Sequence, residues 1–225
     1  MIPSPLAAVV FDMDGLLLDT ETLYRTALFE ACADLGREMA DALHLSLVGA
    51  PKDAAAALIM AHFGPDFPLL QFDARCRVIF EDLCGAGVGL KPGARDLLAF
   101  LKGRGVPRGL ATSTARETAE GHLRQAGLFD LLDVLVTRTD VAFGKPHPET
   151  YLKAAELLGV DPLRCLALED SHNGVRAASA AGMATIMVPD MLQPTDEIRS
   201  LCIGVVGSLE QVQFALEDCL SVVEK

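Results

Sequence analysis

A long helical stretch interrupts an otherwise regular alternation of strand and helix patterns, and this interruption constrains the fold more than any other feature. Short apolar or β-branched runs predict strands at 6–11, 107–111, 133–137, 164–168 and 184–188. Helical patterns, several with proline or glycine at their ends, lie between them at 92–102, 115–125, 149–158 and 174–181. Because strands joined through helices pair in parallel, the alternation predicts an α/β fold with a parallel sheet and helices on both of its faces.

The stretch from about residue 20 to residue 89 contains no convincing strand pattern. Its helical patterns cover 21–35, 52–62 and 72–83, and it ends in a glycine-rich segment at 85–89. The simplest interpretation is an all-helical domain inserted directly after the first strand. We therefore predict a core formed by residues 1–19 and 90–225 and an inserted helical domain formed by residues 20–89.

The chain is acidic, with a formal net charge of −12 at pH 7 over 225 residues. Such a surface repels nucleic acid, so small metabolites and metal cations are the expected partners. The six cysteines form no C-x-x-C pair, which argues against a disulfide framework or a zinc cluster. No apolar stretch reaches membrane-spanning length and no basic segment opens the chain. We expect a cytoplasmic protein without membrane contacts, monomeric or weakly dimeric.

Two carboxylates follow the first predicted strand. Asp12 and Asp14 are two residues apart, so their side chains project in the same direction while the chain is extended. This spacing allows one carboxylate to act on a substrate while the other exchanges a proton. Gly15 then allows backbone N–H groups to approach an anion closely. A solvated turn is the alternative interpretation of this motif taken alone.

The ends of the later strands also carry polar residues. Thr112 and Ser113 precede a helix, where hydroxyls and free N–H groups form an anion site, although ordinary N-capping is equally typical of such residues. Lys145 lies between a glycine and a proline, which restrain its backbone. Its positive charge could neutralise a phosphoryl oxygen. Glu169 and Asp170 are oxygen ligands of the kind that Mg²⁺ prefers, or else a helix cap and its neighbour.

The conjunction of these motifs carries more weight than any one of them. In open α/β sheets, ligands bind beyond the carboxyl ends of the strands. Four strand ends of one parallel sheet here supply an acid pair, a hydroxyl cradle, a lysine and a second acid pair. Transfer of a phosphoryl group from a monoester requires a nucleophile, an acid and base, positive charge and a metal. The set therefore predicts a magnesium-dependent phosphohydrolase.

Four ordered segments of the chain resemble the haloacid dehalogenase superfamily, specifically its members with a helical cap after the first strand. These segments are 11–20, 110–114, 144–148 and 168–174. The resemblance extends over essentially the whole chain. It implies a Rossmann-like core and an α-helical cap that closes over the site and excludes water.

The resemblance also implies a role for each residue of the core. Asp12 corresponds to the nucleophile that forms an aspartyl-phosphate, and Asp14 to the general acid and later the base. Thr112 and the Ser113 N–H would hold a phosphoryl oxygen. Lys145 would bind both that oxygen and Asp12.

The same resemblance implies a Mg²⁺ site. Asp12, the backbone carbonyl of Asp14 and Asp170 correspond to the ligands. Glu169 is either a further ligand or a residue that supports the ligands. Substrate identity lies in the cap and is not decoded by the sequence, so we expect a small phosphate monoester, a sugar phosphate or a related metabolite.

The second acid of the first motif discriminates between activities within the superfamily. Dehalogenases and phosphonate hydrolases lack the equivalent of Asp14, so its presence favours a phosphatase. The main rival is a sugar-phosphate mutase that resembles β-phosphoglucomutase. Two differences in the cap weaken the mutase interpretation. Tyr24 occupies the position where such mutases have a histidine, and Lys52 occupies the position where they have an arginine. Lys52, at the start of a predicted helix, is either a substrate contact or a solvated lysine.

Two interpretations from other functional classes are less favourable. A phosphorylatable receiver module also uses acids, a hydroxyl and a lysine on a parallel sheet, but the helical insertion and the motif around Lys145 argue against it. A scaffold that kept the fold and lost its activity is disfavoured because every core position holds a chemically competent residue type.

Overall fold

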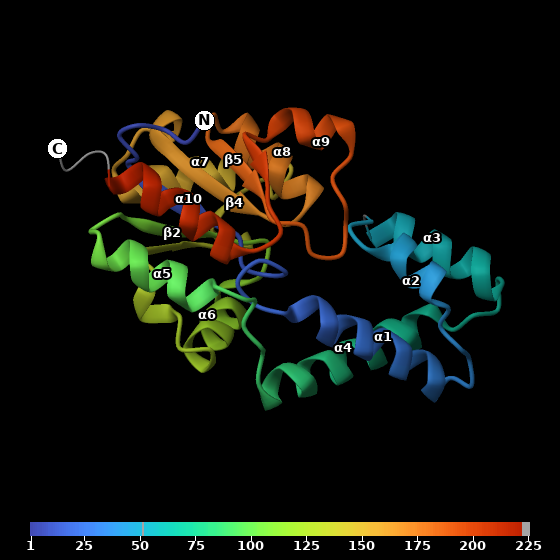
Figure 1. The fold of residues 1–225 in the computed structure, drawn as a ribbon. Helices are drawn as coiled ribbons and strands as arrows, with labels where there is room; N and C mark the ends of the chain where they lie inside the picture. The colour runs from blue at the N-terminus through green and yellow to red at the C-terminus, as the bar shows by residue number, and fades with distance from the viewer. Residues whose placement is uncertain (51, 222–225) are drawn as a thin grey trace. The chain divides into compact units, whose positions relative to one another are not determined.

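The computed structural model describes residues 1–50 and 52–221, without the side chains of residues 52 and 221 (Figure 1). The chain divides into two compact units. Met1–Leu18 with Gly89–Lys225 form one of them, called the core unit below. Asp19–Val88 form the other, called the helical unit.

The core unit is built on a 6-stranded sheet in the order β3-β2-β1-β4-β5-β6, with every neighbouring pair parallel. Its strands are β1 (Ala8–Phe11), β2 (Arg108–Ala111), β3 (Val134–Val136), β4 (Cys165–Glu169), β5 (Ala184–Met187) and β6 (Gly204–Val205). The strand β1 is central, with Val10 paired to Gly109 on one side and to Ala167 on the other. The prediction of an α/β fold with a parallel sheet is confirmed.

Helices cover both faces of this sheet (Figure 1). The helices of the core unit are α5 (Ala94–Gly103), α6 (Arg116–Gln125), α7 (Glu149–Leu158), α8 (His172–Ala180), α9 (Asp196–Leu201) and α10 (Leu209–Ser221). Short 3-10 helices lie at Phe129–Leu131, Arg138–Asp140 and Pro162–Arg164. On one face, Tyr151 of α7 and Ala177 of α8 pack into a core cluster with Val10 and Ala167. The helices α5 and α10 lie against each other on the opposite face (Figure 1).

The helical unit contains α1 (Thr20–Asp34), α2 (Asp41–Leu47), α3 (Lys52–Phe63) and α4 (Leu69–Ala86). Its core joins Ala27 and Ala31 of α1 to Phe72 and Ile79 of α4. No strand occurs among the described residues of 19–88, as the sequence indicates.

Among the described residues, three α-helices, one strand and the short 3-10 helices have no counterpart in the predicted elements. The helices are α2, α9 and α10, and the strand is β6. The helices α2 and α9 are only 7 and 6 residues long, and β6 is only 2 residues long. These three elements are too short to generate a periodic signal.

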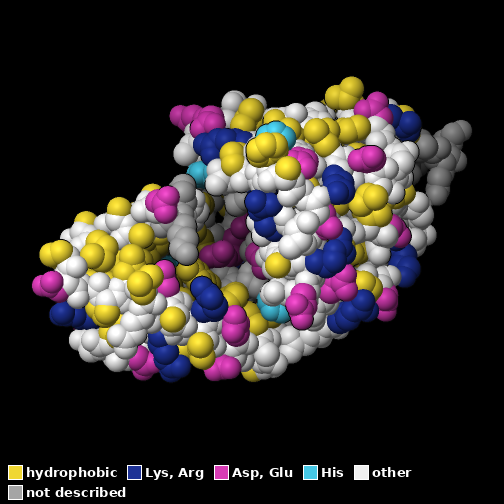
Figure 2. Space-filling model, turned by 180° about the vertical axis from the view of Figure 1, so that it is seen from behind, with side chains coloured by type: hydrophobic (Ala, Val, Ile, Leu, Met, Phe, Trp, Pro, Cys, Tyr) yellow, Lys and Arg dark blue, Asp and Glu magenta, His cyan; other side chains and the backbone are white. Residues whose placement is uncertain are grey.

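The molecular surface is mixed in character. On the face of the core unit drawn in Figure 2, basic and acidic side chains intermingle and do not gather into a basic patch. Large apolar side chains exposed on the helical unit include Leu45, Leu58, Leu70 and Val78. Within the described part of the chain, no helix has both the length and the apolar character needed to cross a membrane.

Candidate functional site

A buried lysine joins two carboxylates at the carboxyl edge of the sheet. Lys145 Nζ donates to Oδ1 of Asp12, at the end of β1, and to Oε1 of Glu169, at the end of β4, at 2.5 Å each. The three side chains are 6%, 10% and 0% exposed, respectively. Glu149 at the start of α7 supports the loop that carries Lys145, because its carboxylate accepts hydrogen bonds from the N–H groups of residues 142 and 143.

Burial and mutual charge shift the pKa values of this group in opposite directions. Burial raises the pKa of Asp12 to about 8, against the opposing effect of Lys145. Burial on its own would lower the pKa of Lys145, but Asp12 and Glu169 outweigh it and raise that pKa. The raised pKa of Lys145 favours its protonated, positively charged form at neutral pH. A further positive charge beside Asp12 would favour its ionised, nucleophilic form.

The carboxylate of Glu169 is held at the amino end of α8. Its Oε2 accepts hydrogen bonds from the N–H of Asp170 and from the N–H and hydroxyl of Ser171, at 3.2, 3.2 and 3.0 Å. Its Oε1 accepts from the hydroxyl of Tyr151 at 2.7 Å, in addition to Lys145. Gly174 makes room for this arrangement, because a Cβ atom there would lie 1.8 Å from Oε1. Ser171 caps α8 by accepting from the Gly174 N–H.

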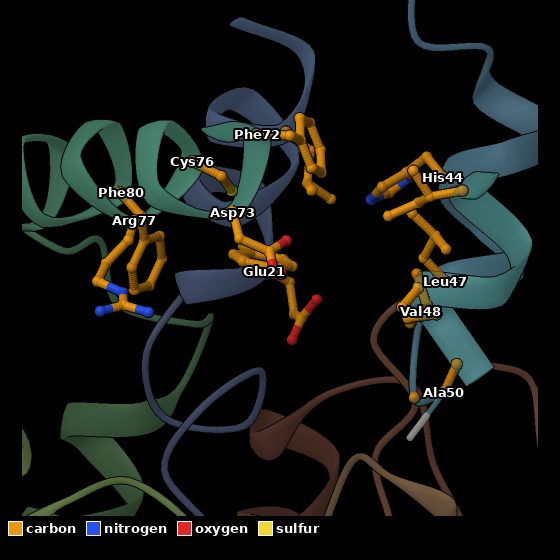
Figure 3. A pocket seen from close by; sticks show the side chains of 16 residues that line it. Glu21, His44, Leu47, Val48, Ala50, Phe72, Asp73, Cys76, Arg77 and Phe80 are labelled. Atoms are coloured by element: carbon orange, nitrogen blue, oxygen red, sulfur yellow. The ribbon is translucent and has the colours of Figure 1, made fainter. Parts of the chain in front are cut away.

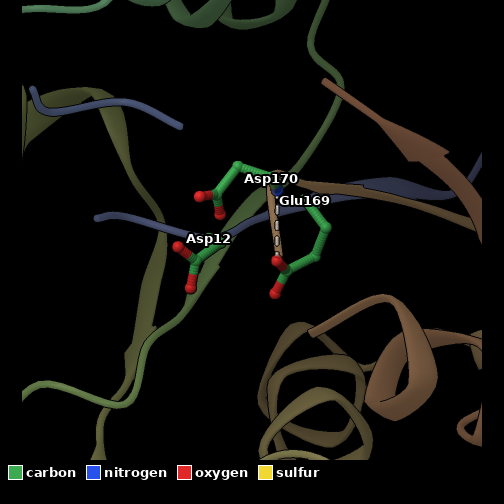
Figure 4. A group of neighbouring side chains, drawn as sticks. All are labelled: Asp12, Glu169 and Asp170. Atoms are coloured by element: carbon green, nitrogen blue, oxygen red, sulfur yellow. Dashed lines mark hydrogen bonds between the residues drawn. The ribbon is translucent and has the colours of Figure 1, made fainter. Parts of the chain in front are cut away.

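Asp12, Glu169 and Asp170 together form an acidic cluster suited to a metal ion (Figure 4). One carboxylate oxygen from each lies within 4.8 Å of the others. Such a set of hard oxygen donors fits Mg²⁺. Gly15 lies directly beside the cluster, because a Cβ atom placed on it would lie only 2.3 Å from Oδ2 of Asp170. Its backbone has φ 81°, which side chains rarely adopt, so both conformation and space require glycine here.

The second acid of the first motif meets the hydroxyl motif after β2. Oδ2 of Asp14 accepts a hydrogen bond from Thr114 Oγ1 at 2.6 Å and lies 3.4 Å from Thr112 Oγ1. Thr112 is buried and in turn accepts from the Thr114 N–H at 3.0 Å. The exposed Ser113 lies between these two threonines in the chain.

The structure thus brings together most of the residues singled out by the sequence. Asp12, Lys145, Glu169 and Asp170 form one group, and Asp14 with Thr112 forms another on the neighbouring strand end. Lys52 belongs to the helical unit, where it is the first residue of α3, and its side chain lies outside the described part of the structure.

Sequence reasoning missed the roles of Tyr151 and Thr114. Tyr151 is fully buried in α7 and reaches Glu169 only because α7 packs against the sheet. No local pattern distinguishes it from a core aromatic residue. Thr114 follows the recognised hydroxyls by one residue, so proximity to that motif is the one signal that could have identified it.

The helical unit contains a pocket of about 490 Å³ (Figure 3). Glu21 and Asp73 on α1 and α4 and His44 on α2 line it from opposite sides, and aromatic rings such as Phe72 and Phe80 complete the wall. Tyr24 also lines it, and burial raises the pKa of its phenol to about 12, so the hydroxyl keeps its proton. A mainly apolar and aromatic lining that carries a few polar groups is typical of a site for a small molecule.

Comparison with known proteins finds relatives that are named phosphatases. Hexitol phosphatase B of Escherichia coli strain K12 is 37% identical over 83% of this chain and 85% of that protein. The phosphorylated carbohydrates phosphatase of Thermotoga maritima is 35% identical over 80% of this chain and 83% of that protein.

Solved structures agree with the observed fold. A haloacid dehalogenase family hydrolase from Deinococcus radiodurans, solved with bound phosphate and sodium, has a TM-score of 0.80 at 28% identity and covers 96% of both chains. The β-phosphoglucomutase of Clostridium difficile has a TM-score of 0.71 at 22% identity, covering 98% of this chain and 100% of its own, which shows a shared fold alone. The family model of haloacid dehalogenase-like hydrolases matches residues 6–182. The chain therefore belongs to the haloacid dehalogenase-like hydrolase family.

Proposed function

We propose that the protein is a Mg²⁺-dependent phosphoric monoester hydrolase that acts on a sugar phosphate or a related small metabolite through an aspartyl-phosphate. One observation carries this proposal: Lys145 bridges Asp12 and Glu169 in a buried cluster that also includes Asp170. The phosphatase names of two relatives above 30% identity support the reaction class.

The first half of the reaction forms a bond between Asp12 and phosphorus. A carboxylate oxygen of Asp12 attacks the phosphorus atom, and the bond from phosphorus to the ester oxygen breaks. Protonated Asp14 gives its proton to the departing alcohol, while Thr114 orients the Asp14 carboxyl group. Lys145, the Thr112 hydroxyl and the Ser113 N–H stabilise the negative charge on the phosphoryl oxygens.

The second half regenerates the enzyme. Asp14, now ionised, takes a proton from a water molecule that attacks the phosphorus atom of the aspartyl-phosphate. The bond between Asp12 and phosphorus breaks, and inorganic phosphate leaves. Asp14 thus loses a proton to the alcohol in the first half and regains one from water in the second half, so it ends the cycle protonated as it began.

We propose that Asp12, Asp170 and the backbone carbonyl of Asp14 hold Mg²⁺. Bound Mg²⁺ supplies positive charge that offsets repulsion between the nucleophile and the phosphoryl group. Both oxygens of Glu169 already accept hydrogen bonds, so we assign it the role of adding negative charge and holding Lys145 and the start of α8. Gly15 keeps the space beside Asp170 open.

The helical unit is proposed to act as a cap that selects the leaving group. Its pocket offers carboxylates and aromatic rings, and hydroxyl groups and sugar C–H faces are complementary to these. The names of the relatives, which refer to hexitols and phosphorylated carbohydrates, agree with a polyhydroxylated leaving group. Lys52 remains a proposed substrate contact. We further propose a cytoplasmic monomer or weak dimer that requires neither nucleic acid nor membrane.

The decisive experiment measures phosphate release from a panel of hexitol and sugar phosphates, with p-nitrophenyl phosphate as a generic ester. Wild-type protein should turn over in Mg²⁺ and lose activity in EDTA, and Asp12→Asn should be inactive. A parallel assay for phosphohexose isomerisation tests the mutase alternative. Absence of Mg²⁺-dependent release, or equal release by Asp12→Asn, would refute the proposal.

A further inference from the structure

A further carboxylate, Asp190, lies beside the acidic cluster. Asp190 follows β5, the strand next to β4 in the sheet. A Cβ atom placed on Gly15 would lie 2.3 Å from Oδ2 of Asp170 and 3.4 Å from Oδ2 of Asp190. The two carboxylates therefore converge on the same side of Gly15, from the ends of neighbouring strands.

Lys91 holds Asp190 in this position. Its Nζ lies 2.8 Å from Oδ1 of Asp190, and the two side chains are 24% and 14% exposed. The backbone N–H of Lys91 donates to the carbonyl of Leu17 at 3.0 Å, so Lys91 is anchored to the segment that follows Asp12 and Asp14. The ion pair consequently fixes the loop after β5 against the loop after β1.

The other oxygen of Asp190 has a different environment. Oδ2 is buried, and within the described residues no group donates a hydrogen bond to it. A buried carboxylate oxygen that lacks a donor is unfavourable, and such atoms are rare in folded proteins. Solvent or a bound ion can supply the donor that the described residues lack. Mg²⁺ usually retains several waters when a protein binds it, and these waters are strong donors.

We propose that Asp190 is a positioning residue of the metal site: its Oδ2 accepts a hydrogen bond from a water that Mg²⁺ retains, and its charge favours the cation. This inference rests on the proposed Mg²⁺-dependent function. It differs from a purely structural role, in which the pair with Lys91 only ties two loops together. The two roles predict different effects of neutralising Lys91, because Lys91 opposes the cation electrostatically but supports the loops mechanically.

Isothermal titration of the substrate-free protein with MgCl₂ tests the proposal without relying on activity. Asp190→Asn should raise the Kd for Mg²⁺ about tenfold, the range seen when groups that support metal ligands are replaced. Lys91→Gln keeps a donor for Asp190 but removes the positive charge, so its Kd should equal that of the wild type or fall below it. Asp133→Asn is the matched control, because Asp133 lies just before β3 and pairs with Arg108, the first residue of β2, at the opposite edge of the sheet.

Each outcome has a defined meaning. If folded Asp190→Asn binds Mg²⁺ as tightly as the wild type, or if Asp190→Asn and Lys91→Gln weaken binding equally, the proposal is wrong. Circular dichroism and thermal unfolding in EDTA verify folding, and Asp190→Ser replaces Asp190→Asn if the latter does not fold. If the wild type itself binds no Mg²⁺, the proposed function fails and this inference fails with it.

Discussion

Lys145 Nζ lies 2.5 Å from Oδ1 of Asp12, although 133 positions separate the two residues in the chain. The same nitrogen lies 2.5 Å from Oε1 of Glu169. One buried cation is therefore shared by two buried carboxylates. In such a group, removal of one member leaves the remaining charges without compensation in a medium that solvates them poorly.

Lys145→Met should impair both catalysis and folding. We expect kcat to fall by at least about 10²-fold because the phosphoryl oxygens lose a positive charge. The free energy of unfolding should fall by about 3 kcal/mol because two buried carboxylates lose their partner. Steady-state kinetics and urea unfolding measure the two effects. Lys102→Met is the control, since Lys102 is exposed and donates to the Asp130 carbonyl; equal behaviour of the two variants would contradict the assignment.

Thr114→Val should slow the reaction according to the leaving group. The substitution removes the hydroxyl that donates to Asp14 at 2.6 Å. With an alkyl phosphate, whose alcohol needs a proton to leave, kcat should fall about tenfold or more. With p-nitrophenyl phosphate, whose leaving group departs as an anion, the fall should be much smaller. The same loss with both esters would indicate that Thr114 does not act through Asp14. Ser200→Ala, at an exposed position of α9, should change neither rate.

Two glycine substitutions should have opposite effects on stability. Gly174→Ala places a methyl group where the Glu169 carboxylate lies, so we expect a loss of about 1–3 kcal/mol and reduced kcat. Gly121→Ala changes an exposed position within α6 that has open space around it, so a gain of about 0.5–1 kcal/mol is expected. Chemical denaturation compares the two variants directly. A neutral Gly174→Ala would show that Glu169 does not need its observed position.

Asp140→Asn should produce a stability difference that depends on pH. Burial by itself would raise the pKa of Asp140, but hydrogen bonds from Thr137 and Arg116 outweigh it and lower the pKa below 3.8. An acid with a lowered pKa contributes stability above its unfolded-state pKa, and this contribution disappears as pH falls through its folded-state pKa.

At pH 7 the variant should therefore be less stable than the wild type by about 1–2 kcal/mol. The difference should persist to about pH 5 and shrink as the pH falls below 3.8. Urea unfolding at a series of pH values measures it. The exposed Asp66→Asn serves as control and should stay within about 0.5 kcal/mol throughout. A difference for Asp140→Asn that did not change with pH would contradict the prediction.

Short-range patterns in the sequence were sufficient to predict the architecture. Alternating strands and helices, with an all-helical stretch after the first strand, predict the parallel sheet that the structure contains. The prediction succeeds because strand burial and helix periodicity act over a few residues. The same locality explains why Asp12, Lys145 and Asp170 could be identified, since each directly follows a strand or lies in a distinctive turn, and parallel strand ends meet at one edge.

Contacts between distant segments depended on the tertiary structure. Lys91 and Asp190 are 99 positions apart, and neither residue carries a local signal of a role beside the acidic cluster. Tyr151 contacts Glu169 because α7 packs on the sheet, and Glu169 occupies its position because Gly174 leaves the space empty. The sequence by itself determined which chemical groups are present and on which strand ends they lie. Only the packing of helices and loops against the sheet decided which of those groups are buried, which are paired, and which keep a carboxylate oxygen without a donor among the described residues. Burial and charge pairing depend on spatial neighbours, and the order of residues along the chain does not reveal these neighbours.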